Sequence, residues 1–473
     1  MLDLSTFDKI LLHKDINQYI VANTFLHVLS NDPVFLEKYN LSVREKIWQS
    51  FRLKIVTVVR IVQTIFDKKI YSTRLNNNKS NVLFVSHLTN MKQILREDDA
   101  YFGDLPNQLL KNNISSSIVL VNHARVNRRK FLDSWAESKI PRYILGASLG
   151  FSSEIKLYLV QRKSKKHLKS ILRSLKIDKK TTKDILYNHM SASTFEALRL
   201  AKQIVDIAQT IDAKFIITTY EGHSWERLVF YYARKLNPSI KCFGYQHAAV
   251  FEHQHAIKRQ LNSQYNPDII LTSGKISHRI LSESELLKCI RINCLGSPKH
   301  TNVKLLKDKV NCCLVVPQGS VFESLLLFEL SFLYAKNNKK QKFIWRLHPL
   351  LSFNKLKKHS SIFEELPNNI YLSEGDLDED VQKSDSVLYR GSTAVINAIS
   401  RGLKPIYYLQ SNDEVSVDPI YQQQKGKKFV INQEQFKVAL NKDIDIEDRQ
   451  SLQDFAHDFY TPFDLEVLTN EIL

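Results

Sequence analysis

The sequence predicts an α/β protein built from two Rossmann-like domains. Two observations support this prediction: the length of 473 residues, and short apolar runs that alternate with amphipathic segments. The length is roughly two to three times that of a typical domain, so two domains are expected. Short buried strands that alternate with helices imply parallel strands joined by crossover helices, and therefore doubly wound sheets.

The first part of the chain is predicted to be helical. The segment SVREKIWQSFRLKIVTVVRIVQTIF repeats apolar residues at spacings of three and four, which is the period of a helix. NNNKSN (76–81) interrupts this pattern, so we expect a helical N-terminal extension over residues 1–80. A Rossmann-like domain is then expected over residues 81–300, with a helix at 221–236. Its predicted strands are 81–87, 116–123, 142–150, 213–220, 239–247 and 267–274.

A second α/β series follows a polar, basic stretch at 296–310, which we interpret as the linker between the domains. The second Rossmann-like domain is expected over residues 310–440, and a helical tail over 441–473. Its predicted strands are 312–320, 342–349, 369–375, 386–392 and 404–410.

The composition excludes several classes of protein. Five cysteines, odd in number and without CxxC spacing, argue against a disulfide scaffold or a zinc finger. No apolar run reaches the length of a membrane span, and the first residues lack the pattern of a secretory signal. We therefore expect a cytoplasmic protein. The 67 Lys and Arg exceed the 49 Asp and Glu by 18, which favours an anionic partner.

One candidate site follows predicted strands of the second domain. In SDSVLYRGSTAVINAISRGLKPIYY (384–408), Ser392 and Thr393 open a helix directly after a strand. Their hydroxyls can bind an anion or simply cap the helix. RLHP (346–349) and the turn around Gly319 also follow strands, at the sheet edge where ligands bind in open α/β sheets. Neither GxGxxG nor a P-loop is present.

These motifs resemble those of GT-B glycosyltransferases, which have two facing Rossmann-like domains. The segment 384–408 resembles their nucleotide-sugar half. His348-Pro349 resembles the His-Pro motif of bacterial sialyltransferases and of CDP-glycerol glycerophosphotransferases, and Kdo transferases show related spacing. The resemblance implies a cytidine-nucleotide donor as substrate and neither a cofactor nor a metal. It implies that His348, Pro349, Ser392 and Thr393 bind the nucleotide. The turn around Gly319 supports the same site by its position between a strand and a helix, and Arg346 could neutralise phosphate charge or simply lie on the surface.

The first domain offers two candidates for the catalytic group. Glu221 follows the strand 213–220 and could act as a general base, or merely stabilise a helix N-terminus. Glu221-Gly222 resembles the acid-plus-Gly motif of bacterial sialyltransferases, although Tyr220 stands where those enzymes carry a second acid. His247 follows the next strand, where CDP-glycerol glycerophosphotransferases carry a catalytic His, and is the rival base. His253 and His255 are not expected to bind a metal.

The same domain carries candidates for binding an acceptor. Asp99 and Tyr101 lie in an aromatic and acidic turn (98–106) that suits carbohydrate, although a plain turn with a helix cap is the alternative. His123 and Arg125 follow the strand 116–123 and point to the same sheet edge.

A basic stretch supplies a further candidate surface. Lys and Arg crowd residues 162–183, where Leu168, Ile171, Leu172 and Leu175 recur at helical spacing. Such a helix can lie on an anionic membrane surface, whereas a solvated helix packed by its apolar stripe is the plain alternative. No nucleic-acid-binding signature accompanies it.

The function that the resemblance implies is transfer of a sugar from CMP-Kdo or CMP-sialate to a glycan or lipid-linked acceptor in capsule or lipopolysaccharide synthesis. The alternatives are a CDP-polyol phosphotransferase and a non-catalytic glycan- or nucleotide-binding module. The acceptor would place the enzyme in the cytoplasm or on the inner face of the cytoplasmic membrane.

Overall fold

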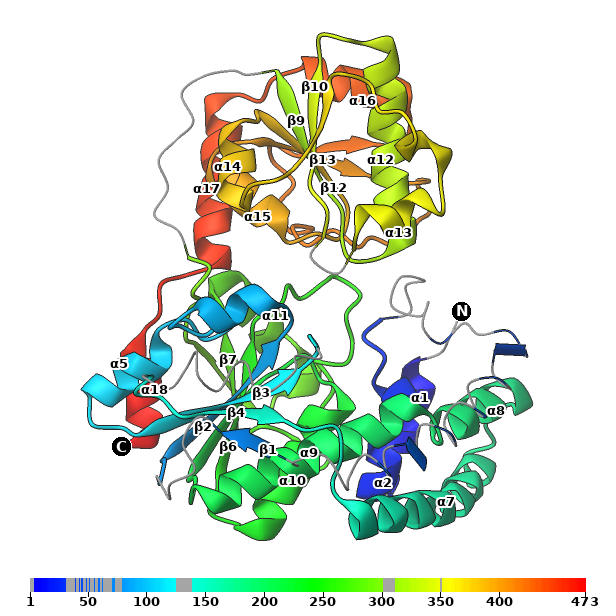
Figure 1. The fold of residues 1–473 in the computed structure, drawn as a ribbon, viewed down its shortest axis with the longest axis vertical. Helices are drawn as coiled ribbons and strands as arrows, with labels where there is room; N and C mark the ends of the chain where they lie inside the picture. Colours follow the sequence, from blue (N-terminus) through cyan, green and yellow to red (C-terminus); the bar gives the residue numbers. More distant parts are fainter. Residues whose placement is uncertain are drawn as a thin grey trace.

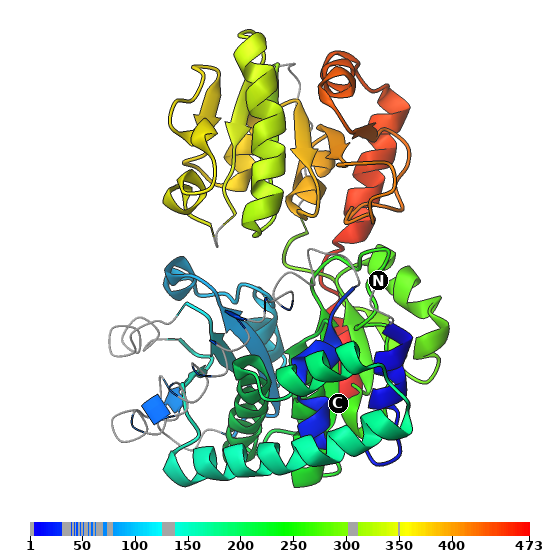
Figure 2. The same cartoon turned by 90° about the vertical axis from the view of Figure 1, so that its right-hand side faces the viewer.

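The computed structural model contains two α/β domains, one above the other in Figures 1 and 2. It describes residues 4–30, 79–124, 138–300, 311–348 and 351–473, together with single residues and short pieces between 39 and 72. Arg125 and Pro349 lie outside the described residues.

The N-terminal domain contains an eight-stranded sheet of order β1-β4-β3-β2-β5-β6-β7-β8. All strands are parallel except β1, which pairs antiparallel with β4. The run β4-β3-β2-β5-β6-β7 has the strand order of a Rossmann fold. The strands are β1 (Ile70–Ser72), β2 (Val82–Leu88), β3 (Ser116–Asn122), β4 (Arg142–Leu145), β5 (Phe215–Thr219), β6 (Lys241–Gln246), β7 (Ile269–Thr272) and β8 (Arg291–Cys294).

The six strands predicted for this domain are present, whereas β1 and β8 were not predicted. Both lie at the sheet edges and are short, and β8 is only partly buried, so neither produces a continuous apolar run.

Helices cover both faces of this sheet. They are α1 (Leu4–Leu11), α2 (Gln18–Val21), α5 (Leu105–Lys111), α7 (Phe151–Ser174), α8 (Lys179–Asn188), α9 (Ala192–Thr210), α10 (Ser224–Leu236) and α11 (Lys275–Ser282). Short 3-10 helices occupy Thr24–His27, Met91–Leu95, Ser263–Tyr265 and Glu285–Leu287. The first helices belong to the same core as the sheet, since Phe7, Ile10 and Leu11 pack in one buried cluster with Leu83 and Val119.

The C-terminal domain repeats the pattern with six parallel strands in the order β11-β10-β9-β12-β13-β14, which is again the Rossmann order. The strands are β9 (Cys312–Val316), β10 (Lys342–Trp345), β11 (Ile370–Leu372), β12 (Ser386–Tyr389), β13 (Lys404–Tyr408) and β14 (Lys428–Val430). The helices are α12 (Val321–Asn337), α13 (Phe353–Lys357), α14 (Leu377–Gln382), α15 (Ala394–Ser400) and α16 (Gln433–Asn441), with a 3-10 turn at Ser361–Phe363. The two Rossmann-like domains predicted from the sequence are therefore confirmed.

The last two helices connect the domains. α17 (Ile446–Phe459) packs against α15 in the C-terminal domain and against α11 in the N-terminal domain. α18 (Leu465–Ile472) then packs against α5 of the N-terminal domain. Between them, Thr461 O accepts a hydrogen bond from Ser297 N (2.9 Å), and Asp464 N donates to Leu295 O (2.8 Å). The chain thus returns to the domain in which it began.

The carboxyl ends of the two sheets face each other. α11 follows β7 and lies on the side of the N-terminal domain nearest the C-terminal domain, whereas α13 and α15 follow β10 and β12 on the opposing side (Figure 1). The side chain of Arg279 in α11 donates to Gln422 Oε1 across the domains (3.1 Å). Within the described part of the chain, no helix is long and apolar enough to cross a membrane.

A glycine holds the returning chain against the first domain, and we expect Gly296→Ala to lower the melting temperature by several degrees. Gly296 has φ +99°, and a Cβ there would lie 2.1 Å from Pro462 O, so backbone strain and a backbone clash act together. Gly402→Ala is the control. Its φ is also positive (+86°), but the nearest atom is the flexible Arg449 side chain at 3.3 Å. Equal melting temperatures for the two variants would contradict a close approach at Gly296.

Candidate functional site

The strand order brings four polar side chains to one edge of the N-terminal sheet. The strands β3, β2, β5 and β6 are neighbours and parallel, so the residues at their carboxyl ends must converge. Those residues are His123 after β3, His87 next to the last residue of β2, Glu221 after β5 and His247 after β6. Sequence reasoning found three of them and missed His87, although this histidine ends its predicted strand as His123 and His247 end theirs.

Glu221 lies between two imidazoles. Its Oε1 is 3.5 Å from His247 Nε2, and its Oε2 is 3.8 Å from His223 Nε2. The side chains of Glu221 and His247 are 23% and 14% exposed, so both reach the surface only in part. Both distances are longer than a hydrogen bond, and a small approach of Glu221 to His247 would bring the carboxylate and the imidazole to the separation at which they can share a proton.

The helix terminus that follows Glu221 has a carboxylate cap of its own. The carboxylate that stabilises the start of α10 is Glu226, which accepts hydrogen bonds from the backbone N–H groups of Glu221, Gly222 and His223 at 2.8–3.2 Å. Burial raises the pKa of Glu226, and the nearby charge of Glu221 raises it further. Because Glu226 takes the capping role, the carboxylate of Glu221 can face the two histidines.

Gly222 is required by the same turn. Its φ is +86°, and a Cβ would lie 2.3 Å from Ala256 O. The Glu-Gly pair that the sequence singled out is therefore a carboxylate held by a turn that only glycine can form.

Burial also determines the protonation state of His247. Burial, followed by the charge of Lys299, lowers the pKa of His247 to about 3, so its imidazole is neutral at physiological pH. Its Nδ1 is buried, and no described residue forms a hydrogen bond with it. The ring meets Tyr101 edge to face, with ring centroids 4.9 Å apart.

Tyr101 lies between His247 and His87 and contacts both rings. Its ring also contacts His87, at 5.3 Å between centroids. Burial, with a smaller contribution from Glu221, raises the pKa of Tyr101 to about 12, so the phenol stays protonated.

Asp99 is placed differently from the other acceptor candidates. It is only 6% exposed, and its Oδ1 accepts hydrogen bonds from Ser86 Oγ (2.8 Å), Tyr101 N (2.8 Å) and Phe102 N (2.9 Å). These contacts match the turn alternative, in which Asp99 shapes the loop that presents Tyr101. Its burial does not favour direct contact with an acceptor.

His87 makes a second set of contacts at this edge. Its Nε2 is 2.8 Å from Thr219 Oγ1, and its Nδ1 is 2.9 Å from His123 Nε2. Trp225 contacts the His87 ring edge to face, with ring centroids 5.8 Å apart. Of the remaining histidines, His255 pairs with Asp8 at 3.0 Å and His253 lies 3.8 Å from Glu252. Among the described residues, no group of three metal-ligating side chains is placed to hold a metal ion.

Three loops meet at the carboxyl edge of the C-terminal sheet. Gly319, after β9, lies against the ring of His348, after β10: a Cβ on this glycine would be 3.1 Å from the ring. Gly391, after β12, lies closer still to Gln318: a Cβ on this glycine would be 2.6 Å from Gln318 Oε1. The predicted turn, His348 of the His-Pro motif and the Gly-Ser-Thr motif therefore adjoin one another.

Ser392 and Thr393 are half-buried at this junction. Thr393 stands at the N-cap of α15 without a side-chain capping bond, so it does not behave as the capping alternative requires. Neither hydroxyl forms a hydrogen bond with another described residue. Both are free to bind a ligand.

Arg346 is already paired. Its Nη1 donates to Asp380 Oδ2 (2.7 Å), Ser373 Oγ (3.0 Å) and Gly375 O (3.1 Å). The contacts tie β10 to the loop after β11, and the charge of Asp380 offsets that of the guanidinium. Any phosphate would share Arg346 with this carboxylate.

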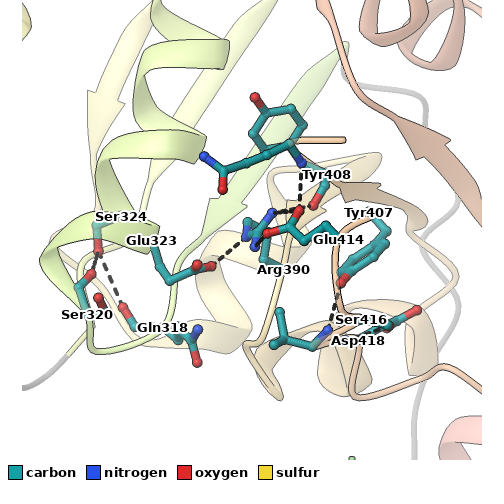
Figure 3. A network of polar contacts seen from close by, with 12 residues as sticks. Gln318, Ser320, Glu323, Ser324, Arg390, Tyr407, Tyr408, Glu414, Ser416 and Asp418 are labelled. Carbon is teal, nitrogen blue, oxygen red and sulfur yellow. Dashed lines mark hydrogen bonds and ion pairs between the residues drawn. The ribbon is translucent and has the colours of Figure 1, made fainter. Parts of the chain in front are cut away.

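A buried ion-pair network supports these loops from beneath (Figure 3). Arg390, at the end of β12, donates to Glu323 Oε2 (2.5 Å), Glu414 Oε1 (2.6 Å) and Tyr408 O (3.0 Å). Burial by itself lowers the pKa of Arg390, but the hydrogen bonds and charges of the two carboxylates raise it overall. Sequence reasoning did not assign this role to Arg390, because Glu323 and Glu414 are distant in the chain.

Beside this network, Asp418 accepts hydrogen bonds from Tyr389 Oη (3.1 Å) and Lys427 Nζ (2.6 Å). The loop between β13 and β14 is thereby fixed to the end of β12.

The basic stretch forms α7, the following turn and the start of α8. α7 runs along the end of the N-terminal domain farthest from the C-terminal domain (Figure 2). Leu168, Ile171 and Leu172 are buried in the core and Leu175 is partly buried, so the apolar stripe packs on the protein as the plain alternative supposed. A different apolar row is exposed at the start of α7: Phe151 (58%), Ile155 (37%) and Leu159 (57%).

Comparison with known proteins gives likeness in fold. No family model and no curated protein matches the chain. The glycotransferase of kitacinnamycin is similar with a TM-score of 0.48 and 10% identity, over 81% of this chain and 95% of its own. A putative UDP-N-acetylglucosamine 2-epimerase from Listeria monocytogenes is similar with a TM-score of 0.47 and 12% identity, over 83% of this chain and 95% of its own. MurG from Acinetobacter baumannii is similar with a TM-score of 0.43 and 11% identity, over 83% of this chain and 99% of its own. At such identities the likeness concerns the fold alone.

Proposed function

We propose that the protein is a glycosyltransferase that moves a sugar from a nucleotide-activated donor to a hydroxyl-bearing acceptor. The observation that carries this proposal is the pair of polar clusters on the facing sheet edges. One is the Glu221–His247 pair, and the other is the junction of Gly319, His348 and Ser392. A general base in one domain and an anion-binding junction in the other are the two parts that such a transfer needs.

In this proposal the C-terminal domain binds the donor. The free hydroxyls of Ser392 and Thr393 bind its phosphate, and Gly319 lets the nucleotide approach the backbone next to His348. Arg346 adds positive charge that it shares with Asp380. Hydrogen-bond donors that are held in place before the reaction stabilise the negative charge that develops on the departing phosphate.

The N-terminal domain binds the acceptor between Tyr101, His123 and the Glu221–His247 pair. As the bond to the sugar forms, the acceptor hydroxyl loses its proton to this pair. His247 is neutral, as a base requires, and the Glu221 carboxylate lies beside it, while Glu226 caps α10. Positioned bases contribute roughly 10²–10⁴ to such rates.

For the donor we propose a cytidine nucleotide, CMP-Kdo or CMP-sialate, on the resemblance of His348 and Ser392 to the motifs described above. The rival is a CDP-polyol phosphotransferase, for which His247 would be the essential base. A binding module without turnover is the third candidate.

We further propose that the acceptor is lipid-linked and that α7 and α8 rest on an anionic membrane surface in capsule or lipopolysaccharide synthesis. Six cations of α7 are exposed, and none forms an ion pair with another described residue: Lys156, Arg162, Lys163, Lys166, Lys169 and Arg173. The exposed row of Phe151, Ile155 and Leu159 lies beside them at the spacing of one helix face. Cations with adjacent apolar side chains fit the interface of an anionic bilayer.

Glu221→Gln and His247→Gln test the catalytic pair. Each is expected to lower kcat by about 10²–10⁴, because the acceptor proton loses its base, while nucleotide binding is unchanged. Transfer assays and nucleotide titrations measure the two effects.

Glu252→Gln combined with His253→Gln is the matched control, since it removes an exposed Glu–His pair 3.8 Å apart on the next loop. Full activity in both Glu221→Gln and His247→Gln would contradict the base assignment. Loss in His247→Gln alone would favour the polyol phosphotransferase.

A thermal-shift panel of CMP, CDP, UDP and GDP tests the donor. CMP and CDP are expected to raise the melting temperature most, and the double variant Ser392→Ala/Thr393→Val should lose most of that shift because the phosphate loses two hydrogen bonds. Ser400→Ala, at the other end of α15, is the control. A preference for UDP or GDP would overturn the cytidine assignment, and no response to any nucleotide would favour a module of another kind.

Sedimentation with anionic vesicles tests the membrane surface. Replacing Arg162, Lys163, Lys166, Lys169 and Arg173 by Gln should reduce binding to phosphatidylglycerol vesicles about tenfold or more at low salt. Replacing Lys336, Lys339, Lys340, Lys357 and Lys358 by Gln, which are exposed on the C-terminal domain, is the charge-matched control. Equal loss in both sets would show that net charge alone drives the association.

A further inference from the structure

His87 connects two elements of the acceptor side, β5 and the end of β3. Both of its ring nitrogens are engaged, Nε2 with Thr219 Oγ1 at 2.8 Å and Nδ1 with His123 Nε2 at 2.9 Å. Tyr101 and Trp225 contact the ring edge to face, at 5.3 and 5.8 Å between centroids. The ring is therefore held in one orientation from four directions.

The direction of the hydrogen bonds follows from Thr219. Its side chain is fully buried, and among the described residues its hydroxyl has a single hydrogen-bond partner, His87 Nε2. If the hydroxyl accepted from His87, its own proton would be buried without an acceptor, at a cost of about 1–3 kcal/mol. Thr219 therefore donates to His87 Nε2.

The proton positions on both histidines then follow in order. A neutral His87 that accepts at Nε2 carries its proton at Nδ1 and donates to His123 Nε2. His123 in turn carries its proton at Nδ1. Burial lowers the pKa of both histidines, which keeps both rings neutral near pH 7. His123 itself is exposed, so its Nδ1–H is available to a ligand.

We propose that His87 is a positioning residue: it fixes His123 as a hydrogen-bond donor, through Nδ1–H, toward an oxygen of the acceptor. The acceptor part rests on the proposed function, whereas the proton pattern does not. A neutral donor at this position suits a sugar hydroxyl or ring oxygen of a glycan and does not require an anionic acceptor.

Nitrogen NMR of the histidine rings tests the pattern directly. In protein labelled at histidine, the expected spectrum near pH 7 shows His87 and His123 each protonated at Nδ1 and bare at Nε2. In Thr219→Val, which keeps the shape and removes the donor, His87 should no longer be held in that single tautomer, and the signals of His123 should change with it. Protonation of His87 at Nε2 in the unaltered protein would overturn the proposal.

Thr218→Val is the matched control. Thr218 is the preceding residue of β5, is equally buried, and its hydroxyl has no hydrogen-bond partner among the described residues. Its variant should leave both tautomers as they are. Tautomers that change equally in both variants would show a general disturbance of β5 and would also overturn the proposal.

A transfer assay adds the functional readout. Thr219→Val is expected to raise the KM for the acceptor about three- to tenfold, the value of one hydrogen bond, with kcat nearly unchanged. If the unaltered protein transfers no sugar, the proposed function fails, while the NMR result still decides the role of His87. An unchanged KM in an active enzyme would overturn the recognition role of His123.

Discussion

The parallel pairing of the strands is the constraint on which the rest of this molecule depends. Parallel strands need crossover helices, and they bring all their carboxyl ends to one edge. In the N-terminal sheet this places His123, His87, Glu221 and His247 at the ends of four neighbouring strands, although up to 160 positions (His87 to His247) separate them in the chain. In the C-terminal sheet it places Gly319, His348 and Ser392 together in the same way. The return of the chain through α17 and α18 then ties the two domains together.

Buried charge fixes the loops that these edges carry. Arg390 is almost fully buried and joins the start of α12 to the loop after β13 through Glu323 and Glu414. Removing one partner of such a buried pair leaves an uncompensated charge and costs about 3–5 kcal/mol. Glu226 plays the corresponding part in the N-terminal domain, where its carboxylate satisfies three backbone N–H groups at the start of α10. In both domains a buried polar side chain orders the loop that carries a less buried candidate residue.

Burial also determines which groups of the candidate site are neutral. The histidines at the edge of the N-terminal sheet are kept from protonation by their surroundings, whereas Tyr101 is kept from losing its proton. The cluster therefore combines a carboxylate with neutral donors and acceptors. This composition suits the recognition and deprotonation of hydroxyl groups. Six exposed cations of the described residues lie instead on α7, at the far end of the domain.

The sequence by itself determined the two α/β domains and most of the strands, because a buried strand must be a short apolar run and a crossover helix must be amphipathic. It also placed Glu221, His247, His348 and Ser392 at the carboxyl edges of the two sheets, because these residues directly follow such runs. Only the tertiary structure decided the rest. It showed that Glu226 rather than Glu221 caps α10, that Asp99 belongs to a turn, and that Arg390 pairs with Glu323 and Glu414. It also showed that the stripe of Leu168 and Ile171 faces the core and that His87 joins Thr219 to His123. The physical reason is common to all of these. Hydrogen bonds and ion pairs between distant segments depend on which strands become neighbours, and the local sequence pattern does not determine which strands pair.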